Sequence, residues 1–537
     1  MSDPAWWQTA VIYQIYPRSF CDANGDGIGD LAGVIQKLDY LADTLGVDAL
    51  WLSPFYPSPM ADFGYDVADY MNVASEYGTL DAFDRLVEAA HARDLRVIID
   101  FVPNHTSDQH PWFEAARSSR EHPKRDWYVW ADPKPDGSPP NNWLSMFGGP
   151  AWTWDEATQQ YYLHTFLKEQ PDLNWRNPAV RDAMFGVLQF WLERGVDGFR
   201  IDVAHFIMKD PAMRDNPPRA TSDTAYHKSR GAYDTQLHLY DHGHPDVHDV
   251  YRQIRSLLDA RGDRVAIGEL HIYDWASWTA FYGEALDEMH LPFNFALLNA
   301  EWSADGVERV VNSLEAALPE GAWPNYVLGN HDEARLATRL GPAHTRLAAV
   351  LLLTLRGTPT LYYGDELGLP EADIPPERQK DPWGKNVPGL GRDGCRTPMP
   401  WTDAPAAGFS EAAPDALWLP IGDGHRALAV DEQLDDPGSV LNLYRRLLAL
   451  RRTTPALQHG RYVPVNQRPD DCFVFIRAHD EAVYLVALNF SDAERTMVLP
   501  SGRHRGTIAC ATDPARDGTA VELYLTLGPH EGVVVEM

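Results

Sequence analysis

Short strand-like runs alternate with amphipathic helical segments over most of this 537-residue chain. Such alternation is typical of parallel β/α folds, because each helix returns the chain to the same end of the sheet and covers one of its faces. Eight strand candidates occur, at residues 11–17, 47–54, 96–102, 196–204, 265–270, 289–297, 323–331 and 357–366. The sequence therefore predicts an α/β fold built on a (β/α)8 barrel of the TIM type.

Helix signals between the strand candidates agree with this architecture. Residues 31–45 carry apolar side chains at helical spacing, which predicts one helix that ends at Gly46. Thr79 is expected to cap the helix before the third strand. Asn177 is expected to cap the helix before the fourth strand, which Pro178 opens.

Two stretches of the chain do not fit the barrel pattern. Residues 105–175 are rich in Trp, Pro, Asn and Gly and too long for a plain connection, which indicates a small domain inserted after the third strand. Short strands of alternating polarity near the C-terminus predict an antiparallel β-sandwich domain over 459–537. The barrel is assigned to residues 1–104 and 176–458, with an irregular Pro-rich excursion at 370–420 near the cleft.

The composition excludes several classes of partner. With 46 Lys+Arg against 77 Asp+Glu the formal charge is −31, which repels nucleic acid and anionic membranes, so a small neutral substrate is expected. The four cysteines show no disulfide or zinc spacing. The longest apolar run, at 347–355, is too short to span a bilayer. A soluble cytoplasmic protein is expected, and no oligomeric state is predicted.

Polar side chains stand at the ends of the strand candidates, where a (β/α)8 barrel carries its chemistry. They are Asp62 after the second strand, Asn104 and His105 after the third, Arg200 and Asp202 on the fourth, Glu269 on the fifth, and His331 and Asp332 on the seventh. Asp202 and Glu269 come from neighbouring strands, so their carboxyl groups are expected to flank one substrate bond. Two carboxyls about 5 Å apart are the arrangement that cleaves a glycosidic bond with retention of configuration.

Several short motifs give the chain a family resemblance. The segments "DFVPNH", "GFRIDVAHF", "GEL" and "GNHDEAR", in this order and spacing, resemble the signature regions of the α-amylase family of glycoside hydrolases, family 13. The segments "QPDLNW", "WWQTAVIYQIYPRSF" and "GRDGCRTPMPW" are similar to the α-glucosidase and oligo-1,6-glucosidase branch, which acts at chain ends. The resemblance covers nearly the whole chain and implies a hydrolase that needs no organic cofactor.

The resemblance also implies a role for each matching residue. Asp202 is expected to be the nucleophile, Glu269 the general acid and base, and Asp332 a carboxylate that binds sugar hydroxyls. The pocket for the terminal glucose is expected to include Asp62, Tyr65, His105, Arg200, His331 and either Arg392 or Arg396, with Phe147 and Phe166 as aromatic walls or as core.

The two catalytic carboxyls need opposite protonation states. Arg200 lies two residues from Asp202 on the same strand face and is expected to hold the pKa of Asp202 down, so that the nucleophile is ionised. Glu269 is expected to begin protonated, in drier surroundings or beside the negative charges of Asp202 and Asp332.

A glycine- and aspartate-rich stretch, "CDANGDGIGDLAG" at 21–33, follows the first strand candidate. Its spacing is that of a calcium loop, but position 12 is a glycine instead of a bidentate glutamate. In relatives of this branch a similar loop holds Ca²⁺ or Mg²⁺, so a structural ion is expected, and a metal-free turn is the alternative. The expected ligands are Asp22, Asn24, Asp26, the Ile28 carbonyl and Asp30.

The linkage that is cleaved is left open at this stage. Val203 follows the expected nucleophile and resembles enzymes that prefer α-1,6 bonds. Residues 215–234, which should line the aglycone side, and the segment "GELHIYDW" depart from typical oligo-1,6-glucosidases. Activity on α-1,4 bonds, or mixed activity on maltose, sucrose or aryl glucosides, is the alternative.

The function expected from these features is a retaining, exo-acting α-glucosidase. It would release terminal non-reducing α-linked glucose from short oligosaccharides through a covalent β-glucosyl-enzyme. A glucosyl transferase or a sucrose or maltose isomerase would use the same residues and pass the glucosyl group to a sugar. A starch-cutting α-amylase is disfavoured by the branch motifs. A non-catalytic transporter-associated relative would lack the carboxyls and carry a membrane segment.

Overall fold

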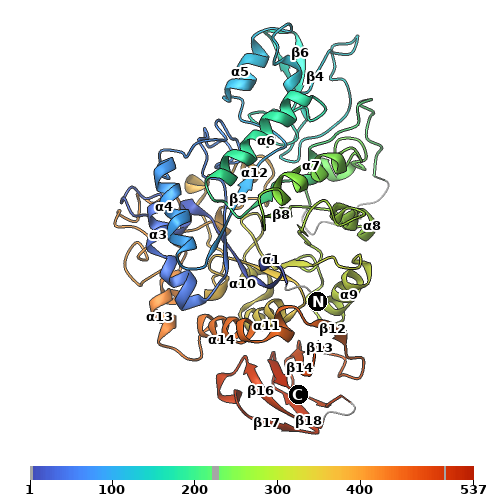
Figure 1. Cartoon of the computed structure of the whole chain (residues 1–537). Coiled ribbons are helices and arrows are strands. Elements are labelled where there is room, and N and C mark those ends of the chain that lie inside the picture. The colour runs from blue at the N-terminus through green and yellow to red at the C-terminus, as the bar shows by residue number, and fades with distance from the viewer. Residues whose placement is uncertain (1–3, 220–228, 501–503) are drawn as a thin grey trace.

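An eight-stranded parallel sheet forms the centre of the computed structural model, which describes residues 4–219, 229–500 and 504–537 (Figure 1). Its strands are β1 (Ile12–Ile15), β2 (Ala49–Leu52), β3 (Arg96–Phe101), β7 (Gly198–Ile201), β8 (Val265–Gly268), β9 (Leu291–Pro292), β10 (Asn325–Val327) and β11 (Thr358–Tyr362). Neighbours follow the order β10-β11-β1-β2-β3-β7-β8-β9. A parallel bridge between Asn294 and Tyr326 joins the two edges. Each strand lies within a predicted region, so the predicted barrel is confirmed.

Two apolar layers hold the barrel together. Inward-facing side chains, among them Ile12, Trp51 and Ile267, fill the interior. Outward-facing side chains pack against the surrounding helices in a second, larger cluster. Because both faces are buried, the strands read as continuous apolar runs. The main barrel helices are α4 (Leu80–His91), α6 (Pro178–Glu193), α7 (Val247–Asp259), α8 (Trp275–Thr279), α9 (Ala304–Ala317), α10 (Leu336–Leu340), α11 (Pro342–Thr354) and α14 (Val440–Thr453).

The single helix predicted for residues 31–45 is divided in the structure. It consists of α3 (Leu31–Gln36) and a π-helical segment, Tyr40–Leu45, which ends at Gly46 with φ +88° as predicted. The wider π turn keeps Leu41 and Leu45 buried, while the Tyr40 hydroxyl donates to buried Glu366 at 3.0 Å. Apolar spacing alone does not reveal this change of helix type, because both forms bury the same leucines.

The two predicted helix caps are both present. The side chain of Thr79 accepts a hydrogen bond from the amide of Ala82 at the start of α4. The side chain of Asn177 accepts one from the amide of Ala179 at the start of α6, in which Pro178 is the first residue. These bonds satisfy amides that would otherwise lack partners in the first helical turn.

A small antiparallel sheet with a helix beside it lies between β3 and α6. The sheet has the order β4-β6-β5, and the helix is α5 (Pro111–Ser118). Figure 1 shows this inserted region at one end of the molecule. Because β3 ends at the rim of the barrel, the insertion stands over the carboxyl ends of the strands. The strands are β4 (Trp130–Ala131), β5 (Trp152–Asp155) and β6 (Gln160–Leu163).

The C-terminal domain is one continuous antiparallel sheet that wraps around its own core. Its order is β12-β13-β14-β19-β16-β17-β18-β15, and Val474 of β13 and Leu525 of β18 share one apolar cluster. Its other face packs on the barrel, where Arg477 donates to the Thr354 carbonyl at 2.6 Å. The strands are β12 (Arg461–Pro464), β13 (Cys472–His479), β14 (Ala482–Asn489), β15 (Arg495–Val498), β16 (Arg505–Ala511), β17 (Ala520–Glu522), β18 (Tyr524–Leu527) and β19 (Gly532–Glu536).

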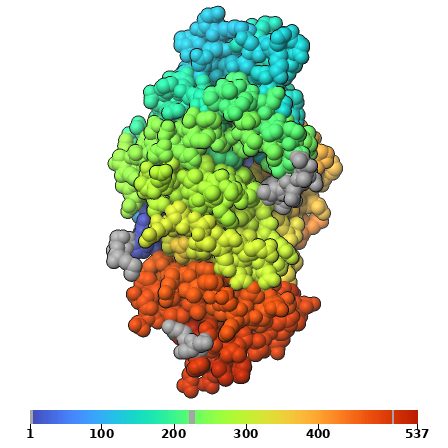
Figure 2. Space-filling view, turned by 90° about the vertical axis from the view of Figure 1, so that its right-hand side faces the viewer, coloured from blue at the N-terminus to red at the C-terminus, as the bar shows by residue number. Residues whose placement is uncertain are grey.

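The three parts are stacked along the long axis of the molecule. In Figure 2 the inserted region lies at the top, the barrel in the middle and the C-terminal sheet at the bottom. The Pro-rich excursion after β11 contains α12 (Pro382–Asn386), and α13 (Val430–Leu434) follows it. None of the described helices is both long and apolar enough to cross a lipid bilayer.

Candidate active site

A pocket opens at the carboxyl ends of the barrel strands, where the sequence predicts the chemistry. Its wall is formed by Asp62, Tyr65, His105, Met146, Phe147, Phe166, Asp202, Val203, Arg230, Glu269, His271, Asp332, Glu333, Trp383 and Arg392. The three predicted catalytic carboxyls therefore face one cavity. Of the other residues predicted for the pocket, Arg200 and His331 lie behind this surface, where they are 1% and 0% exposed.

Asp202 and Glu269 each extend a barrel strand by one residue. The amide of Asp202 donates to the carbonyl of Phe101 at 2.9 Å, and the amide of Glu269 donates to the carbonyl of Ile201 at 3.0 Å. These bonds continue the parallel ladders of β7 and β8, so both side chains project from the barrel rim into the pocket.

One buried guanidinium joins the two carboxyls. Arg200 Nη1 lies 2.7 Å from Asp202 Oδ1, and Arg200 Nη2 lies 2.7 Å from Glu269 Oε2. Nη1 also lies 2.6 Å from Asp100 Oδ1, a residue that sequence reasoning did not select although it opens the motif "DFVPNH". Arg200 therefore holds the catalytic carboxyls in place and does not line the pocket.

The protonation states of the pair differ from the prediction. Burial raises the pKa of Asp202 well above its usual range, and Arg200 counters this effect only in part. Burial also raises the pKa of Glu269, but Arg200 and His271 outweigh burial and bring the pKa to about 2. The prediction of an ionised Asp202 and a protonated Glu269 is therefore wrong for the ligand-free pocket. The physical reason is that one guanidinium serves three buried carboxyls, while Glu269 has a second donor in His271.

The backbone turns sharply directly after Asp202. Val203 has φ +37°, a conformation that is unusual for a β-branched residue. The turn aims the amide of Val203 at Glu269, and this amide donates to Oε2 at 2.9 Å. Strained backbone of this kind is typical of functional sites, and here it ties the loop after one carboxyl to the other carboxyl.

An ion-pair network forms part of the pocket wall. Arg392 Nη2 lies 2.7 Å from Asp62 Oδ1, and Arg392 Nη1 lies 2.9 Å from Asp332 Oδ1. Asp381 holds the same guanidinium from the other side at 2.6 Å. Burial acts to raise the pKa of Asp332, but His331 and the neighbouring arginines hold that pKa well below its usual range. Asp332 is therefore ionised and can accept hydrogen bonds from a ligand in the pocket.

The structure separates the two arginine candidates that the sequence left open. Arg392 lines the pocket, whereas Arg396 is 1% exposed and lies beneath it. Arg396 Nε donates to the carbonyl of His331 at 2.7 Å, and its Nη2 donates to Asp332 at 2.9 Å. Arg392 is thus placed to contact a ligand, and Arg396 supports the loop that carries Asp332.

The two predicted pocket histidines occupy different layers. His105 is on the wall, with Nε2 lying 3.1 Å from Gln170 Nε2 and from the Tyr65 carbonyl oxygen. His331 lies behind Tyr65, with its Nε2 2.6 Å from the Tyr65 hydroxyl. Burial lowers the pKa of His105 to about 4 and that of His331 to about 3, so both rings are neutral at pH 7. His331 was expected to line the pocket, but it lies behind Tyr65 and supports the wall from there.

Aromatic side chains form the wall beside the ion pairs of Asp62, Asp332 and Arg392. Phe147 stacks on Trp383 with ring centroids 5.1 Å apart and meets Phe166 edge to face at 5.6 Å. Phe147 and Phe166 therefore serve both as pocket wall and as part of an apolar cluster, which joins the two roles that the sequence left as alternatives. Trp383 was missed, because it lies in the irregular excursion, where no periodicity marks it.

Four further residues of the pocket wall were not selected by sequence reasoning: Met146, Arg230, His271 and Glu333. They come from separate loops that carry no family motif, apart from Glu333, which lies within "GNHDEAR". The segment 215–234 was predicted to line the aglycone side. Its residues 220–228 lie outside the described residues, and Arg230 does line the pocket.

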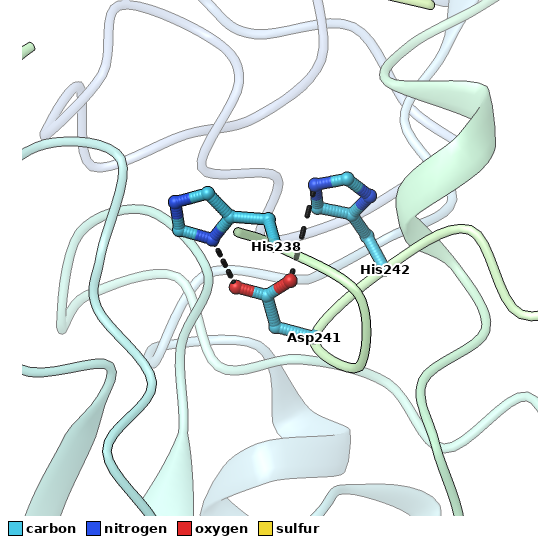
Figure 3. A group of neighbouring side chains, drawn as sticks. All are labelled: His238, Asp241 and His242. Carbon is cyan, nitrogen blue, oxygen red and sulfur yellow. Dashed lines mark hydrogen bonds and ion pairs between the residues drawn. The ribbon is translucent and has the colours of Figure 1, made fainter. Parts of the chain in front are cut away.

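A cluster of two histidines and an aspartate lies in the segment that follows (Figure 3). Asp241 Oδ2 lies 2.5 Å from His238 Nδ1, and Asp241 Oδ1 lies 3.9 Å from His242 Nε2. Figure 3 shows each ring facing a different oxygen of the carboxylate. His238 Nε2 also lies 2.8 Å from the Tyr233 carbonyl oxygen, so both its nitrogens face acceptors. The arrangement is that of histidine–carboxylate pairs that hold the loop together.

The predicted metal loop is held by hydrogen bonds from its own backbone. Asp22 accepts from the amide of Gly27 at 2.7 Å, and Asp26 accepts from the amide of Ile28 at 2.9 Å. Asp30 caps α3 by accepting from the amide of Gly33 at 2.6 Å. In the described part of the chain, the carboxylates of this loop do not form a group close enough to share an ion. The oxygen donors of the loop suit Ca²⁺ or Mg²⁺.

Comparisons with known proteins agree with this geometry. The catalytic-domain model of alpha amylase matches residues 14–460. The chain is 46% identical to a probable alpha-glucosidase of Rhizobium meliloti (strain 1021) over 517 residues, or 93% of this chain and 92% of that protein. It is 34% identical to an oligo-1,6-glucosidase of Parageobacillus thermoglucosidasius, with 92% of each chain covered.

Solved structures include enzymes that transfer glucose as well. A crystal structure of an alpha-glucosyl transfer enzyme matches with a TM-score of 0.93 at 43% identity, covering 99% of this chain and 100% of that one. A crystal structure of a trehalulose synthase matches with a TM-score of 0.90 at 34% identity, covering 99% of this chain and 100% of that one. The same architecture thus occurs in a glucosyl transfer enzyme and in a trehalulose synthase.

Proposed function

Since the chain belongs to the α-amylase family of glycoside hydrolases, we propose that it is a retaining, exo-acting α-glucosidase. The observation that carries the proposal is the single guanidinium of Arg200, which contacts both Asp202 and Glu269 at 2.7 Å. Two carboxyls bridged in this way favour the short separation of a retaining enzyme over the roughly 6.5–9.5 Å that an inverting water needs.

The proposed reaction has two steps. Asp202 attacks the anomeric carbon while Glu269 gives a proton to the leaving oxygen, so a covalent glucosyl-enzyme forms as the glycosidic bond breaks. Glu269 then removes a proton from water, which attacks the same carbon and frees Asp202. Asp202 must be ionised and Glu269 protonated in the first step, so their protonation must change when substrate fills the pocket.

The ion pairs on the pocket wall support action at chain ends. Asp62, Arg392 and Asp332 lie on loops that follow different strands, and their ion pairs join these loops across the wall. A terminal glucose can present its hydroxyls to these charged groups, which bind it with charge-assisted hydrogen bonds. Short oligosaccharides are therefore the proposed substrates.

The anomeric form of the first product tests the mechanism. With maltotriose or isomaltose as substrate, proton NMR during the first minutes should detect α-glucose, released one residue at a time from the non-reducing end. Initial β-glucose would overturn retention, and cleavage of maltopentaose into maltose and maltotriose before any glucose is released would overturn exo action. Rates on isomaltose, maltose, sucrose and trehalose, compared side by side, give the linkage preference.

Transfer of the glucosyl group to a sugar is the second candidate, favoured by the 43% identity to an alpha-glucosyl transfer enzyme. The first step is unchanged, and only the acceptor differs. Product analysis at rising maltose or sucrose concentration separates the two activities. A hydrolase releases the same amount of free glucose per cleaved bond at every substrate concentration, whereas a transferase accumulates new disaccharides or trisaccharides.

We also propose that the loop 22–30 binds Ca²⁺ or Mg²⁺ as a structural ion, away from the reacting bond. Support comes from its oxygen donors, Asp22, Asn24, Asp26 and Asp30, and from the spacing of these residues. Metal analysis of the purified protein should find one ion, and a chelator should lower the Tm. Asp26→Ala should remove both the ion and the chelator response. Protein that is metal-free and insensitive to the chelator would contradict the proposal.

The proposed compartment is the cytoplasm. The four cysteines are free and buried, as expected for a protein that folds under reducing conditions. Thiol titration of the denatured, unreduced protein should count four free thiols, and a lower count would contradict this proposal.

A further inference from the structure

Asp241 is a buried carboxylate with one oxygen left unpaired. Its Oδ2 accepts a hydrogen bond from Asn216 Nδ2 at 2.9 Å and lies 2.5 Å from His238 Nδ1. Its Oδ1 is buried and has no hydrogen-bond partner among the described residues. Because buried polar atoms are normally paired, an unpaired oxygen on a residue that is 7% exposed points to a ligand from outside the protein chain.

The atom that this oxygen faces is His242 Nε2, 3.9 Å away (Figure 3). The gap is too long for a hydrogen bond. A metal ion with bonds of about 2.0–2.2 Å, the lengths usual for zinc, bridges it, because two such bonds span up to about 4 Å. The ring of His242 packs against Phe206 at 4.5 Å and against His205 at 5.3 Å between centroids, which fixes its direction.

His238 supplies a third ligand atom on the other side of the carboxylate. Its Nε2 lies 2.8 Å from the Tyr233 carbonyl oxygen, and since a carbonyl can only accept, Nε2 carries a hydrogen. Nδ1 is therefore the nitrogen that can bind a metal. A backbone carbonyl behind the ring is a usual support of metal-binding histidines. The Tyr233 ring also stacks on His238, with centroids 3.7 Å apart.

We propose that His238, Asp241 and His242 together bind one zinc ion. Ligand atoms of the three side chains already lie within 4.8 Å of one another. One proton between His238 Nδ1 and Asp241 Oδ2 satisfies this pair when no ion is bound, and the zinc ion displaces that proton. Two ligand atoms of a tetrahedral zinc lie about 3.3 Å apart, so the pair opens by less than about 1 Å, and water completes the coordination.

The donor set separates this site from the loop 22–30. Two imidazole nitrogens favour Zn²⁺, whereas Ca²⁺ and Mg²⁺ prefer oxygen ligands. The site is also connected to the pocket, because the Arg230 guanidinium lies over the Tyr233 ring at 4.8 Å and Arg230 lines the pocket wall. The zinc ion thus stabilises the loop that follows Arg230. This inference goes beyond the proposed glucosidase activity and does not rest on it.

Titration calorimetry with zinc chloride tests the site, on protein that has been cleared of metal and then supplied with excess Ca²⁺. We expect one Zn²⁺ per chain in addition to any bound Ca²⁺. The measured heat should depend on the ionisation enthalpy of the buffer, because zinc binding releases a proton. Zn²⁺ should also raise the Tm, since it binds the folded state. Mg²⁺ at the same concentration should have neither effect.

His242→Gln removes one ligand and should weaken zinc binding by at least roughly 10²-fold. Its 3.9 Å contact with Asp241 is too long for a hydrogen bond, so the folded loop loses little. His479→Gln is the matched control, because His479 Nε2 lies 3.2 Å from His459 Nε2 in a second close pair of histidines. This variant should keep the wild-type affinity for Zn²⁺.

Hydrogen exchange of the wild-type protein locates the ion independently of how well the variants fold. Zn²⁺ should slow amide exchange in residues 231–243 and leave the C-terminal sheet unchanged. Asp241→Asn is a second variant and should remove this protection. Equal zinc affinity of the wild type and His242→Gln would overturn the inference. Loss of binding only in His479→Gln, or equal binding of Mg²⁺, would overturn it as well.

Discussion

The two sides of the pocket are built in different ways. On the glucose side, Asp62, Asp332 and Arg392 form ion pairs between loops that lie up to 330 residues apart in the chain. Elsewhere on the wall, Arg230 and His271 come from separate loops, and His271 Nε2 lies 3.0 Å from Glu269 Oε1. We expect the ion pairs on the glucose side to fix the bound sugar, whereas the loops on the other side can change their residues without loss of that recognition. Chemistry that varies among relatives is expected on the second side.

Asp202→Asn should lower the rate most, because it removes the proposed nucleophile, which both sides of the pocket surround. We expect kcat to fall by roughly 10⁴-fold or more, as for other residues that act on the reacting atom. Steady-state rates on 4-nitrophenyl α-glucoside measure the loss. Asp249→Asn, an exposed position on α7, is the matched control and should keep normal rates. Near-normal turnover of Asp202→Asn would refute the assigned mechanism.

Arg392→Lys should disrupt the ion pairs on the glucose side and leave the rest of the pocket unchanged. Lysine cannot reproduce the planar fork that bonds Asp62, Asp332 and Asp381 together. We expect kcat/KM to fall by roughly 10²-fold, or about 3 kcal/mol, the cost of leaving buried charges without their partner. The exposed change Arg426→Lys is the control. A loss below about 5-fold would mean that the network is not needed for glucose recognition.

Two buried histidines near the glucose side should make the free energy of unfolding depend on pH. His105 and His331 are neutral in the folded protein, with pKa values lowered by burial to about 4 and about 3, whereas an unfolded histidine has a pKa of about 6.5. The unfolded state therefore binds more protons below that pH, so stability is greatest above it and falls as pH approaches 4. His105 alone corresponds to about 3 kcal/mol.

Calorimetry between pH 7 and pH 4 checks this expectation. The Tm should fall steadily over that range, and His105→Gln should reduce the dependence on pH, because glutamine does not titrate. A Tm that is constant down to pH 4 would contradict the neutral state of these buried rings.

Among these substitutions, Val203→Thr should change the rates least. It tests a residue that lies between the two sides of the pocket. Val203 lies on the wall directly after the nucleophile and is 8% exposed, so a hydroxyl there changes contacts to the leaving sugar. We expect the isomaltose-to-maltose ratio of kcat/KM to shift towards maltose by roughly 2–10-fold. Activity on 4-nitrophenyl α-glucoside is the internal control. An unchanged ratio would mean that residue 203 does not select the linkage.

The sequence-based predictions that the structure confirms are those that depend on hydrophobic periodicity and on the positions of strand ends. The eight barrel strands lie in the predicted regions because both of their faces are buried, which makes each one a continuous apolar run. Asp202 and Glu269 could be selected because they stand at the ends of such runs.

Several site residues gave no signal of this kind. Trp383 lies in an irregular loop, and His331 and Arg200 were placed on the pocket surface although both lie behind it. The direction of the pKa shifts at Asp202 and Glu269 was predicted the wrong way round, because the sequence shows Arg200 beside Asp202 but not its second contact to Glu269. Contact with His271, from the same strand end, could not be read from spacing alone.

The sequence by itself determined the barrel, the helix caps and which carboxyls stand at the rim, because burial and local hydrogen bonding act between residues close in the chain. Only the tertiary structure decided how charge is shared among those carboxyls. Hydrogen bonds and Coulomb interactions depend on distances of a few ångströms between side chains such as Asp62 and Arg392, and packing of distant segments sets those distances. That is why the fold could be predicted from the chain while the protonation of the catalytic pair could not.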